Sequence, residues 1–404
     1  MADPRAVVLY NLGGCFARGD GGVAQNPIEA ARYYELAAER GHAKAQFNLG
    51  VCFAYGTGTA QNSTEAARYY QLAAAQGHAE AQFALGSCFE QGDGVAQDSV
   101  EALRYYRPAA AQGHAGAQFN LGGCFARGDG VAQDSTEAVR YYGLAAAQGL
   151  AEAQFHLGIC FEQGDGVARD SAEAVRYFGL AAAQGHAHAQ NNLGYCFAHG
   201  NGVAQDWVEA LRHYRLAAAQ GLAEAQFAIG VRLERGVGVA QDCAEAVRYY
   251  RLAAAQGHAQ AQFCLGVCFE RGEGVAQDST EAARYYGLAA EQGHAEAQLF
   301  LGLAFAQGRG VARDSAEAVR NYRLAAAQAD ELSQEQLEFA TAALGRLAAD
   351  RELAVACCLG CGARRKLKRC SKCLVARFCG TECVARAWPA HQPNCRLWRP
   401  EVQA

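Results

Sequence analysis

Residues 117–152 read AQFNLGGCFARGDGVAQDSTEAVRYYGLAAAQGLAE, and this stretch recurs along most of the chain. Eight copies have 36 residues, and the first has 37 because an extra glycine enters at Gly21-Gly22. A fixed period of this length is typical of stacked supersecondary units. The copies begin at Val8, Ala45, Ala81, Ala117, Ala153, Ala189, Ala225, Ala261 and Ala297.

Each copy predicts two short helices joined by a glycine turn. Apolar residues at helical spacing, such as Ala117 and Leu121, predict a first helix that ends near Gly128. Asp134 is placed to cap a second helix, which Gly149 closes, and Glu137 three residues later completes a predicted capping box. One pair of short helices buries too little surface to be stable, so the copies are expected to stack and share a continuous core.

Three residue columns repeat from copy to copy. One ring per copy is predicted to fill the core between the helices: Tyr34, Tyr70, Tyr106, Tyr142, Phe178, Tyr214, Tyr250, Tyr286 and Tyr322. The cysteine column is expected to be buried and free, because stacked helices lie roughly 9–10 Å apart and a disulfide needs Cα atoms within about 7 Å. The histidine column is interrupted by Leu150 and Leu222, which favours packing over metal binding.

The repeating motifs resemble the Sel1-like repeat, a relative of the tetratricopeptide repeat. The resemblance rests on Leu-Gly-x-x-Phe, Gly-x-Gly-Val, the Asp or Asn cap, Glu-Ala-x-x-Tyr-Tyr and Leu-Ala-Ala-x-x-Gly, and it covers residues 8–332. It implies an all-α fold, a right-handed α-solenoid of nine 36-residue helix-turn-helix repeats. It also implies an adaptor that binds other proteins and carries no chemistry of its own.

The repeat pattern breaks after Gln328, and a different organisation follows. Ser333 to Gln336 reads as another capping box and opens a helix to about Asp350. We therefore divide the chain into a repeat array (1–332), a capping or linker helix (333–356), a cysteine-rich module (357–396) and a short tail (397–404).

The cysteine-rich module contains eight residues with the spacing of metal ligands. Eight N/S ligands make two tetrahedral sets, and such sets select Zn²⁺. About forty residues build too small a core to fold alone, so metal must supply folding energy. The candidate ligands are Cys358, Cys361, Cys370, Cys373, Cys379, Cys383, His391 and Cys395, with Cys357 as an alternative to Cys358.

The same spacing resembles the MYND-type zinc finger over residues 358–395. The resemblance implies interleaved sites, in which Cys358, Cys361, Cys379 and Cys383 bind one zinc ion and Cys370, Cys373, His391 and Cys395 bind the other. Sites filled entirely by protein ligands are structural rather than catalytic. The resemblance also implies binding of proline-containing peptides, and Trp388 matches the family's tryptophan position, which makes it a candidate partner-binding residue.

The charge and the amino-acid composition indicate in which cellular compartment the protein is expected. Residues 357–404 hold ten Lys/Arg and two Glu, which leaves a net charge of −13 on residues 1–356. The chain has 17 cysteines, no apolar run of membrane-spanning length and no apparent secretion signal after Met1. We therefore expect a reducing compartment, cytoplasmic or nuclear, and no membrane contact.

A variable surface on the first helices is the candidate partner site. Positions 48, 51 and 55 and their equivalents lie on one helix face and differ between otherwise similar copies. If the first helices line the inner side of the solenoid, these positions form a binding groove; neutral variation on a solvated face is the alternative. The candidates are Asn120, Arg127, His156, Asn192, Tyr195 and His199.

These observations favour a zinc-binding scaffold for protein or peptide partners, with no small-molecule substrate. One alternative is a nuclear regulator that binds nucleic acid through the basic stretch Arg364–Arg369. Another is an adaptor in ubiquitin-linked degradation. An enzyme is not expected, because the candidate catalytic residue types of the array occur only in its repeating columns.

Overall fold

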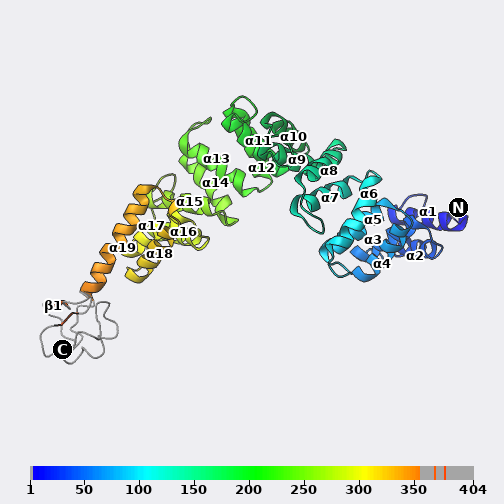
Figure 1. Cartoon of the computed structure of the whole chain (residues 1–404), viewed down its shortest axis with the longest axis horizontal. Coiled ribbons are helices and arrows are strands. Elements are labelled where there is room, and N and C mark those ends of the chain that lie inside the picture. Colours follow the sequence, from blue (N-terminus) through cyan, green and yellow to red (C-terminus); the bar gives the residue numbers. More distant parts are fainter. Residues whose placement is uncertain (1–2, 355–367, 370–376, 379–404) are drawn as a thin grey trace, which may run out of the picture. The chain divides into compact units, whose positions relative to one another are not determined.

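The computed structural model describes residues 3–354, 368–369 and 377–378. Each copy of the array forms a first helix and a second helix, and Figure 1 shows the helices as successive pairs. The first helices are α1 (Pro4–Arg18), α3 (Ala43–Tyr55), α5 (Ala79–Gln91), α7 (Ala115–Arg127), α9 (Ala151–Gln163), α11 (Ala187–His199), α13 (Ala223–Arg235), α15 (Ala259–Arg271) and α17 (Ala295–Gln307). The second helices are α2 (Pro27–Ala38), α4 (Ser63–Ala75), α6 (Ser99–Ala111), α8 (Ser135–Ala147), α10 (Ser171–Ala183), α12 (Trp207–Ala219), α14 (Cys243–Ala255), α16 (Ser279–Glu291) and α18 (Ser315–Ala327).

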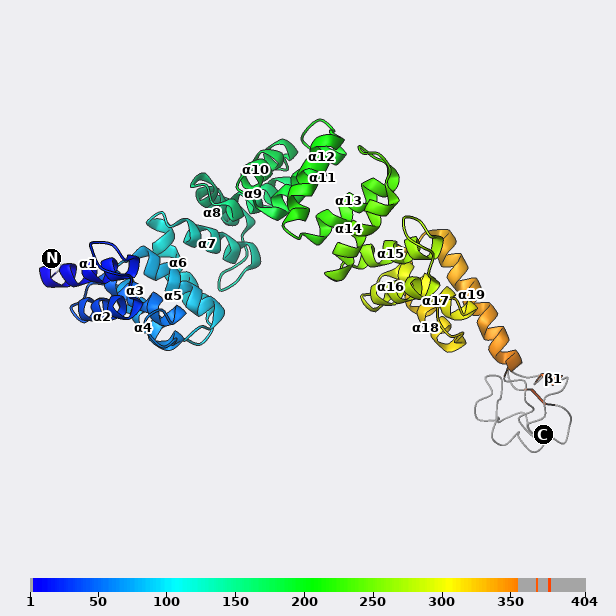
Figure 2. The same cartoon turned by 180° about the vertical axis from the view of Figure 1, so that it is seen from behind.

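The chain forms two compact units, residues 1–225 and 226–404. In each unit a first helix packs on the second helix of its own copy and on the second helix of the preceding copy, as α7 packs on α8 and on α6. After a short 3-10 turn, η1 (Ala329–Glu331), the second unit continues into α19 (Gln334–Ala354), which packs on α18 (Figure 2). Two short strands, β1 (Lys368–Arg369) and β2 (Arg377–Phe378), pair antiparallel, with Lys368 opposite Phe378. Among the described residues, no helix combines the length and apolar character needed to cross a lipid bilayer.

The second helices begin at the predicted cap. Asp134 Oδ1 accepts hydrogen bonds from the backbone N–H groups of Thr136 (3.0 Å) and Glu137 (3.1 Å). The predicted capping box is half formed, because the Asp134 N–H already donates to the Phe125 carbonyl at 2.9 Å. Glu137 is therefore free to pair with Arg140 at 2.7 Å.

The first helices from α3 on begin two residues earlier than predicted, and the histidine column caps six of them. His114 Nδ1 accepts a hydrogen bond from the Ala117 N–H at 3.1 Å. A neutral imidazole thus satisfies one of the donors that a helix start leaves unpaired. The same bond forms at His42, His78, His186, His258 and His294, whereas Leu150 at the start of α9 makes no side-chain cap.

These caps make stability depend on pH. Burial lowers the pKa of His114 below its ordinary value of 6.5, and it does the same at His42, His78, His186 and His294. The unfolded chain therefore takes up more protons, so the caps contribute fully above about pH 6.5 and less as pH falls. We expect the thermal midpoint to fall between pH 7.5 and pH 5.5, with each cap contributing about 0.5–1 kcal/mol.

The matched variants separate capping from general acid effects. His114→Asn keeps a capping oxygen that does not titrate, so it should reduce the pH dependence by the contribution of one cap. Leu150→Asn adds the same kind of cap where the wild type has no histidine, so it should leave the pH dependence unchanged. Equal slopes for wild type and His114→Asn would contradict the cap assignment.

The core follows the predicted ring column. Tyr142 is 5 % exposed, and Gly122 of the preceding helix lies under its ring, where a Cβ atom would come within 2.7 Å of Tyr142 Cδ1. A side chain at Gly122 would hold the two helices apart. The described cysteines are free, and those of the predicted column are buried at Cys52, Cys124, Cys196 and Cys268 but only half-buried at Cys15, Cys88 and Cys160. Cys243 and Cys264, outside that column, are free as well.

Consecutive copies also meet through the glycine turns. Gly130 has a φ of 69° and lies against the start of α6 in the preceding copy. A Cβ atom there would lie 2.6 Å from the carbonyl oxygen of Ser99. The turn therefore requires glycine both for its backbone conformation and for the approach of the neighbouring copy.

Helix α19 begins with the predicted capping box. Gln336 N donates to Ser333 Oγ at 3.2 Å, and Ser333 N donates to Gln336 Oε1 at 2.8 Å. The helix ends at Ala354 rather than near Asp350. Ala340 and Ala343 lie in one buried cluster with Tyr322 of α18, so the helix covers apolar surface of the last pair.

Candidate partner-binding surface

A ladder of buried glutamines joins each copy to the next. Gln118 is 5 % exposed, and its Nε2 donates to the Ala110 carbonyl at 3.1 Å. Its Oε1 accepts from Gln148 Nε2 at 2.7 Å. Both ends of a buried amide are thereby satisfied, which a buried polar group requires. The corresponding buried residues are Gln46, Gln82, Gln154, Gln190, Gln226, Gln262 and Gln298.

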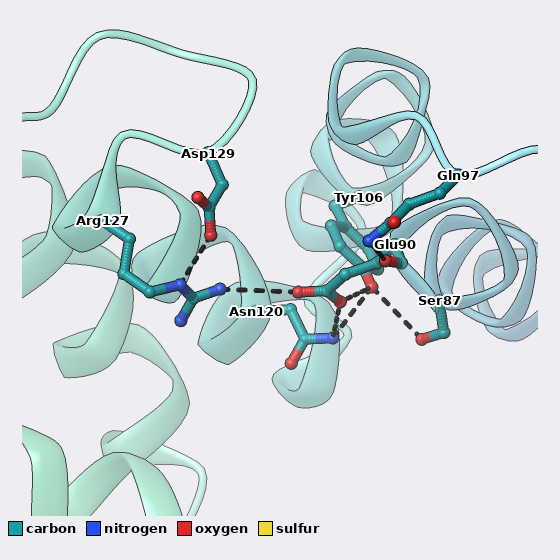
Figure 3. Close-up of polar contacts among 7 residues, drawn as sticks. All are labelled: Ser87, Glu90, Gln97, Tyr106, Asn120, Arg127 and Asp129. Atoms are coloured by element: carbon teal, nitrogen blue, oxygen red, sulfur yellow. Dashed lines mark hydrogen bonds and ion pairs between the residues drawn. The ribbon is translucent and has the colours of Figure 1, made fainter. Parts of the chain in front are cut away.

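A polar network links side chains of α5, α6 and α7 (Figure 3). The Tyr106 hydroxyl donates to Glu90 Oε2 at 2.6 Å, and Asn120 Nδ2 donates to the Tyr106 oxygen at 3.0 Å. Arg127 Nη2 lies 3.5 Å from the other carboxylate oxygen of Glu90. The carboxylate of Glu90 thus binds one hydroxyl and one guanidinium supplied by neighbouring helices.

The second unit repeats the central bond of this network. Tyr250 OH donates to Glu234 Oε2 at 2.8 Å, and Tyr286 OH donates to Glu270 Oε2 at 2.6 Å. Arg309 lies 3.6 Å from Glu270, in a role like that of Arg127. A glutamate at this position therefore recruits a tyrosine hydroxyl and, in two copies, an arginine.

The candidate residues predicted from sequence fall into two groups. Asn120 and Arg127 belong to the internal network, and Arg127 also binds Asp129 at 2.6 Å. His156 stacks on Tyr142 with ring centroids 5.4 Å apart, and burial lowers its pKa. Their side chains are thus already held by contacts within the array.

Tyr195 and His199 form the more open group. The Tyr195 side chain is 44 % exposed, and its ring centroid lies 4.0 Å from that of His199. A ring nitrogen of His199 lies 2.9 Å from the Tyr195 carbonyl, which fixes the imidazole against the helix. Asn192 lies one turn earlier on the same helix and is half-buried. Trp388 and the eight candidate zinc ligands lie outside the described residues.

Family comparison matches the array in nine segments. The Sel1 repeat model covers residues 6–42, 43–78, 79–114, 115–150, 151–186, 187–222, 223–258, 259–294 and 295–330. The chain is a Sel1 repeat protein. The segments begin two residues before the copies defined from sequence, which agrees with the histidine caps at the starts of the first helices.

The Sel1 repeat protein also contains a MYND finger, matched over residues 358–395. That family implies zinc binding, and the match contains all eight Cys and His candidates. Over 40 residues the chain is 45 % identical to the human histone-lysine N-methyltransferase SMYD3, a match that covers 10 % of this chain and 9 % of that protein.

Solved structures support the fold. The c5321 protein, described as a protective antigen of uropathogenic Escherichia coli with an SLR fold, is 25 % identical, with a TM-score of 0.60 over 91 % of this chain and 97 % of its own. A Sel1 repeat protein from Oxalobacter formigenes is 30 % identical, with a TM-score of 0.59 over 84 % of this chain and 93 % of its own. The predicted fold class, Sel1-like helix-turn-helix repeats followed by a MYND finger, is confirmed.

Four copies of this Sel1 repeat protein have a glutamate at the position of Glu90, and in one of them the bond to a tyrosine hydroxyl is missing. Glu162 occupies the position of Glu90, but the residue opposite is Phe178, which is fully buried and has no hydroxyl. Glu162 was not predicted from the sequence, because it differs from Glu90 only in the residue opposite, which is Phe178 instead of a tyrosine. A comparison of the glutamate and ring positions within each copy would have found it.

The same region contains a hollow on the other side of α11. It encloses about 640 Å³ and is lined by residues of α10, α11 and α12, including Gly179, Phe197 and His213. The His213 ring stacks on Phe197 at 5.7 Å, and Arg212 donates to its Nε2 at 3.0 Å, which places the ring proton on Nδ1. His213 stands where seven other copies have tyrosine and the last copy has Asn321.

Proposed function

We propose that this Sel1 repeat protein is a zinc-binding scaffold that holds one protein on its repeat array and a peptide of another on its MYND finger. The observation that carries the proposal is the contrast between copies. In three copies a first-helix glutamate binds a tyrosine hydroxyl within the array. In contrast, α11 presents Tyr195 and His199 to solvent, and α3 presents Tyr55. A rigid array that exposes a few distinctive side chains suits recognition rather than catalysis.

The proposed scaffold works without chemical transformation. Among the described residues, no group of three or more His, Cys, Asp or Glu side chains is arranged to hold a metal ion. The nine free cysteines support a reducing compartment, which we propose to be the cytoplasm or the nucleus. Proline-containing peptides are the proposed ligands of the finger, with Trp388 in contact with them.

Proximity labelling of the full-length protein tests the scaffold. We expect a reproducible set of labelled proteins, part of which is lost when Asn192 and Tyr195 are both replaced by alanine. A second part should be lost when Trp388 is replaced by alanine. Labelling indistinguishable from that of an unrelated protein of similar size would contradict the proposal.

The finger is expected to hold two zinc ions per chain. Cys361→Ser and Cys370→Ser remove one thiolate from each proposed set, so each variant should lose about one zinc ion, since a structural site needs all four ligands. Elemental analysis of the purified full-length protein provides the measurement. Cys243→Ser changes a free cysteine of the array and should retain both ions. Loss of no zinc in either finger variant would rule out the proposed ligand sets.

A further inference from the structure

Two copies of the array show which partners bind a glutamate at the position of Glu90. Glu90 binds the Tyr106 hydroxyl at 2.6 Å and the Arg127 guanidinium at 3.5 Å (Figure 3). In the second unit, Glu270 binds Tyr286 at 2.6 Å and Arg309 at 3.6 Å. A glutamate at this position therefore accepts from a tyrosine hydroxyl and pairs with a cation, and at Glu90 the Asn120 amide also donates to it at 3.5 Å.

Glu162 occupies the same position in its copy, but its neighbours have changed. Phe178 replaces the tyrosine, His199 replaces the arginine, and Ile159 replaces Ser87. Among the described contacts, Glu162 has neither a hydrogen bond nor an ion pair within 4 Å. Burial raises its pKa, and the nearby charge of Arg169 only partly opposes this effect. The carboxylate is partly desolvated without the partners that its equivalents have.

Helix α11 supplies one amide and one aromatic side chain at positions equivalent to those that lie near Glu90. Asn192 stands where Asn120 donates to the tyrosine hydroxyl, and no described contact uses its amide. Tyr195 stands where Gly123 lies in the earlier copy, and it is 44 % exposed. A carboxylate, an amide and an exposed aromatic ring are the groups that bind a cationic side chain.

We propose that Glu162, Asn192 and Tyr195 form a docking site for a lysine or arginine side chain on a segment of a partner protein. The cation takes the place that Arg127 and the Tyr106 hydroxyl occupy around Glu90. Asn192 orients the carboxylate or accepts from the cation through its carbonyl oxygen, and the Tyr195 ring covers it. The proposal rests on the scaffold function and specifies the chemistry of one of its partners.

The charge of the chain favours this occupant. Residues 1–356 carry a net charge of −13, which attracts basic segments over long range at low ionic strength. Because Phe178 has no hydroxyl, the Glu162 carboxylate lacks the internal donor that its equivalents have. A cationic partner can therefore form a charge-assisted hydrogen bond with Glu162.

Two substitutions test the site in opposite ways. Glu162→Gln removes the charge and keeps the shape. Phe178→Tyr keeps the charge but supplies the hydroxyl that donates to the equivalent carboxylate in the other copies, so it should lock Glu162 internally and raise the thermal midpoint. Each should weaken binding of a cationic segment about tenfold. Glu224→Gln, on an exposed residue outside the site, makes the same change in net charge and should have no effect.

The experiment uses the full-length protein and four pools of random peptides with a fixed central residue: arginine, lysine, citrulline or norleucine. Wild type should retain the arginine and lysine pools over the two neutral pools at low salt. Glu162→Gln and Phe178→Tyr should abolish this preference while circular dichroism shows an intact helical fold. Retention of all four pools alike, or a preference that survives both substitutions, would overturn the proposal.

Two further outcomes separate the cation site from the scaffold function and from occupation by the chain's own basic stretch. If neutralising Arg364, Arg365, Lys366, Lys368 and Arg369 increases retention of the arginine pool, the chain's own basic stretch occupies the site, and the assignment to a partner is wrong. If proximity labelling finds partners whose capture is unchanged in Glu162→Gln and Phe178→Tyr, the scaffold stands and the cation site is wrong.

Discussion

Replacing Gly130 with alanine is expected to destabilise the first unit by about 3 kcal/mol or more. Gly130 has a φ of 69°, and a β-carbon would lie 2.6 Å from both the carbonyl carbon and the carbonyl oxygen of Ser99. The left-handed conformation alone costs a non-glycine residue about 1–2 kcal/mol. The overlap with Ser99 adds to this, because it can be relieved only by moving two copies apart.

Gly149→Ala is the matched control for backbone strain. Gly149 has a φ of 90°, and a β-carbon there would meet nothing within 4 Å. Gly149→Ala should therefore lower the free energy of unfolding only by the cost of the left-handed backbone conformation. Urea unfolding of the full-length protein, followed by circular dichroism, measures both variants. Equal losses for Gly130→Ala and Gly149→Ala would mean that the contact between copies contributes nothing.

Replacing Gly122 with alanine is expected to destabilise the array by about 1–3 kcal/mol, the usual range for overpacking a core. The new methyl group would lie 2.7 Å from Tyr142 Cδ1 and 3.2 Å from the Ala138 carbonyl oxygen. Tyr142 is buried beneath its neighbours, so the ring has little room to withdraw. Either the two helices of the copy separate or the ring leaves its position.

Gly143→Ala should have the opposite sign. Gly143 is also helical, but a β-carbon there would meet nothing within 4 Å. Alanine should stabilise that helix by up to about 1 kcal/mol, because glycine is the poorer helix former. The two substitutions add the same atom to the same copy. A stabilising effect at both positions would show that the tyrosine does not rest on Gly122.

The period and the local helix signals could be predicted from the sequence, because they depend on residues close together in the chain. Asp134 caps α8 through neighbouring N–H groups, and the predicted ring column is buried. The exchange of histidine for Leu150 suggested packing, yet His114 and its equivalents accept cap bonds. A helix tolerates the absence of one cap, so such an exchange does not exclude a capping role.

The glutamine ladder and the carboxylate network could not be predicted in the same way. Gln118 binds Gln148, which lies 30 residues away at the end of the same copy, and it binds the carbonyl of Ala110 in the preceding copy, so its buried position depends on contacts beyond its own helix. Asn120 and Arg127 varied between copies and were therefore predicted to bind a partner. The structure shows that they accompany Glu90, so part of their variation follows the presence of that carboxylate.

The glutamine ladder has an evolutionary consequence. Each of its side-chain bonds spans 30 residues and each of its carbonyl bonds spans 8, so every rung uses the same two offsets. An in-frame duplication or loss of one whole period would place an equivalent glutamine at the new junction. The protein can therefore gain or lose whole copies during evolution, and the glutamine hydrogen bonds at the new junction form without further mutation.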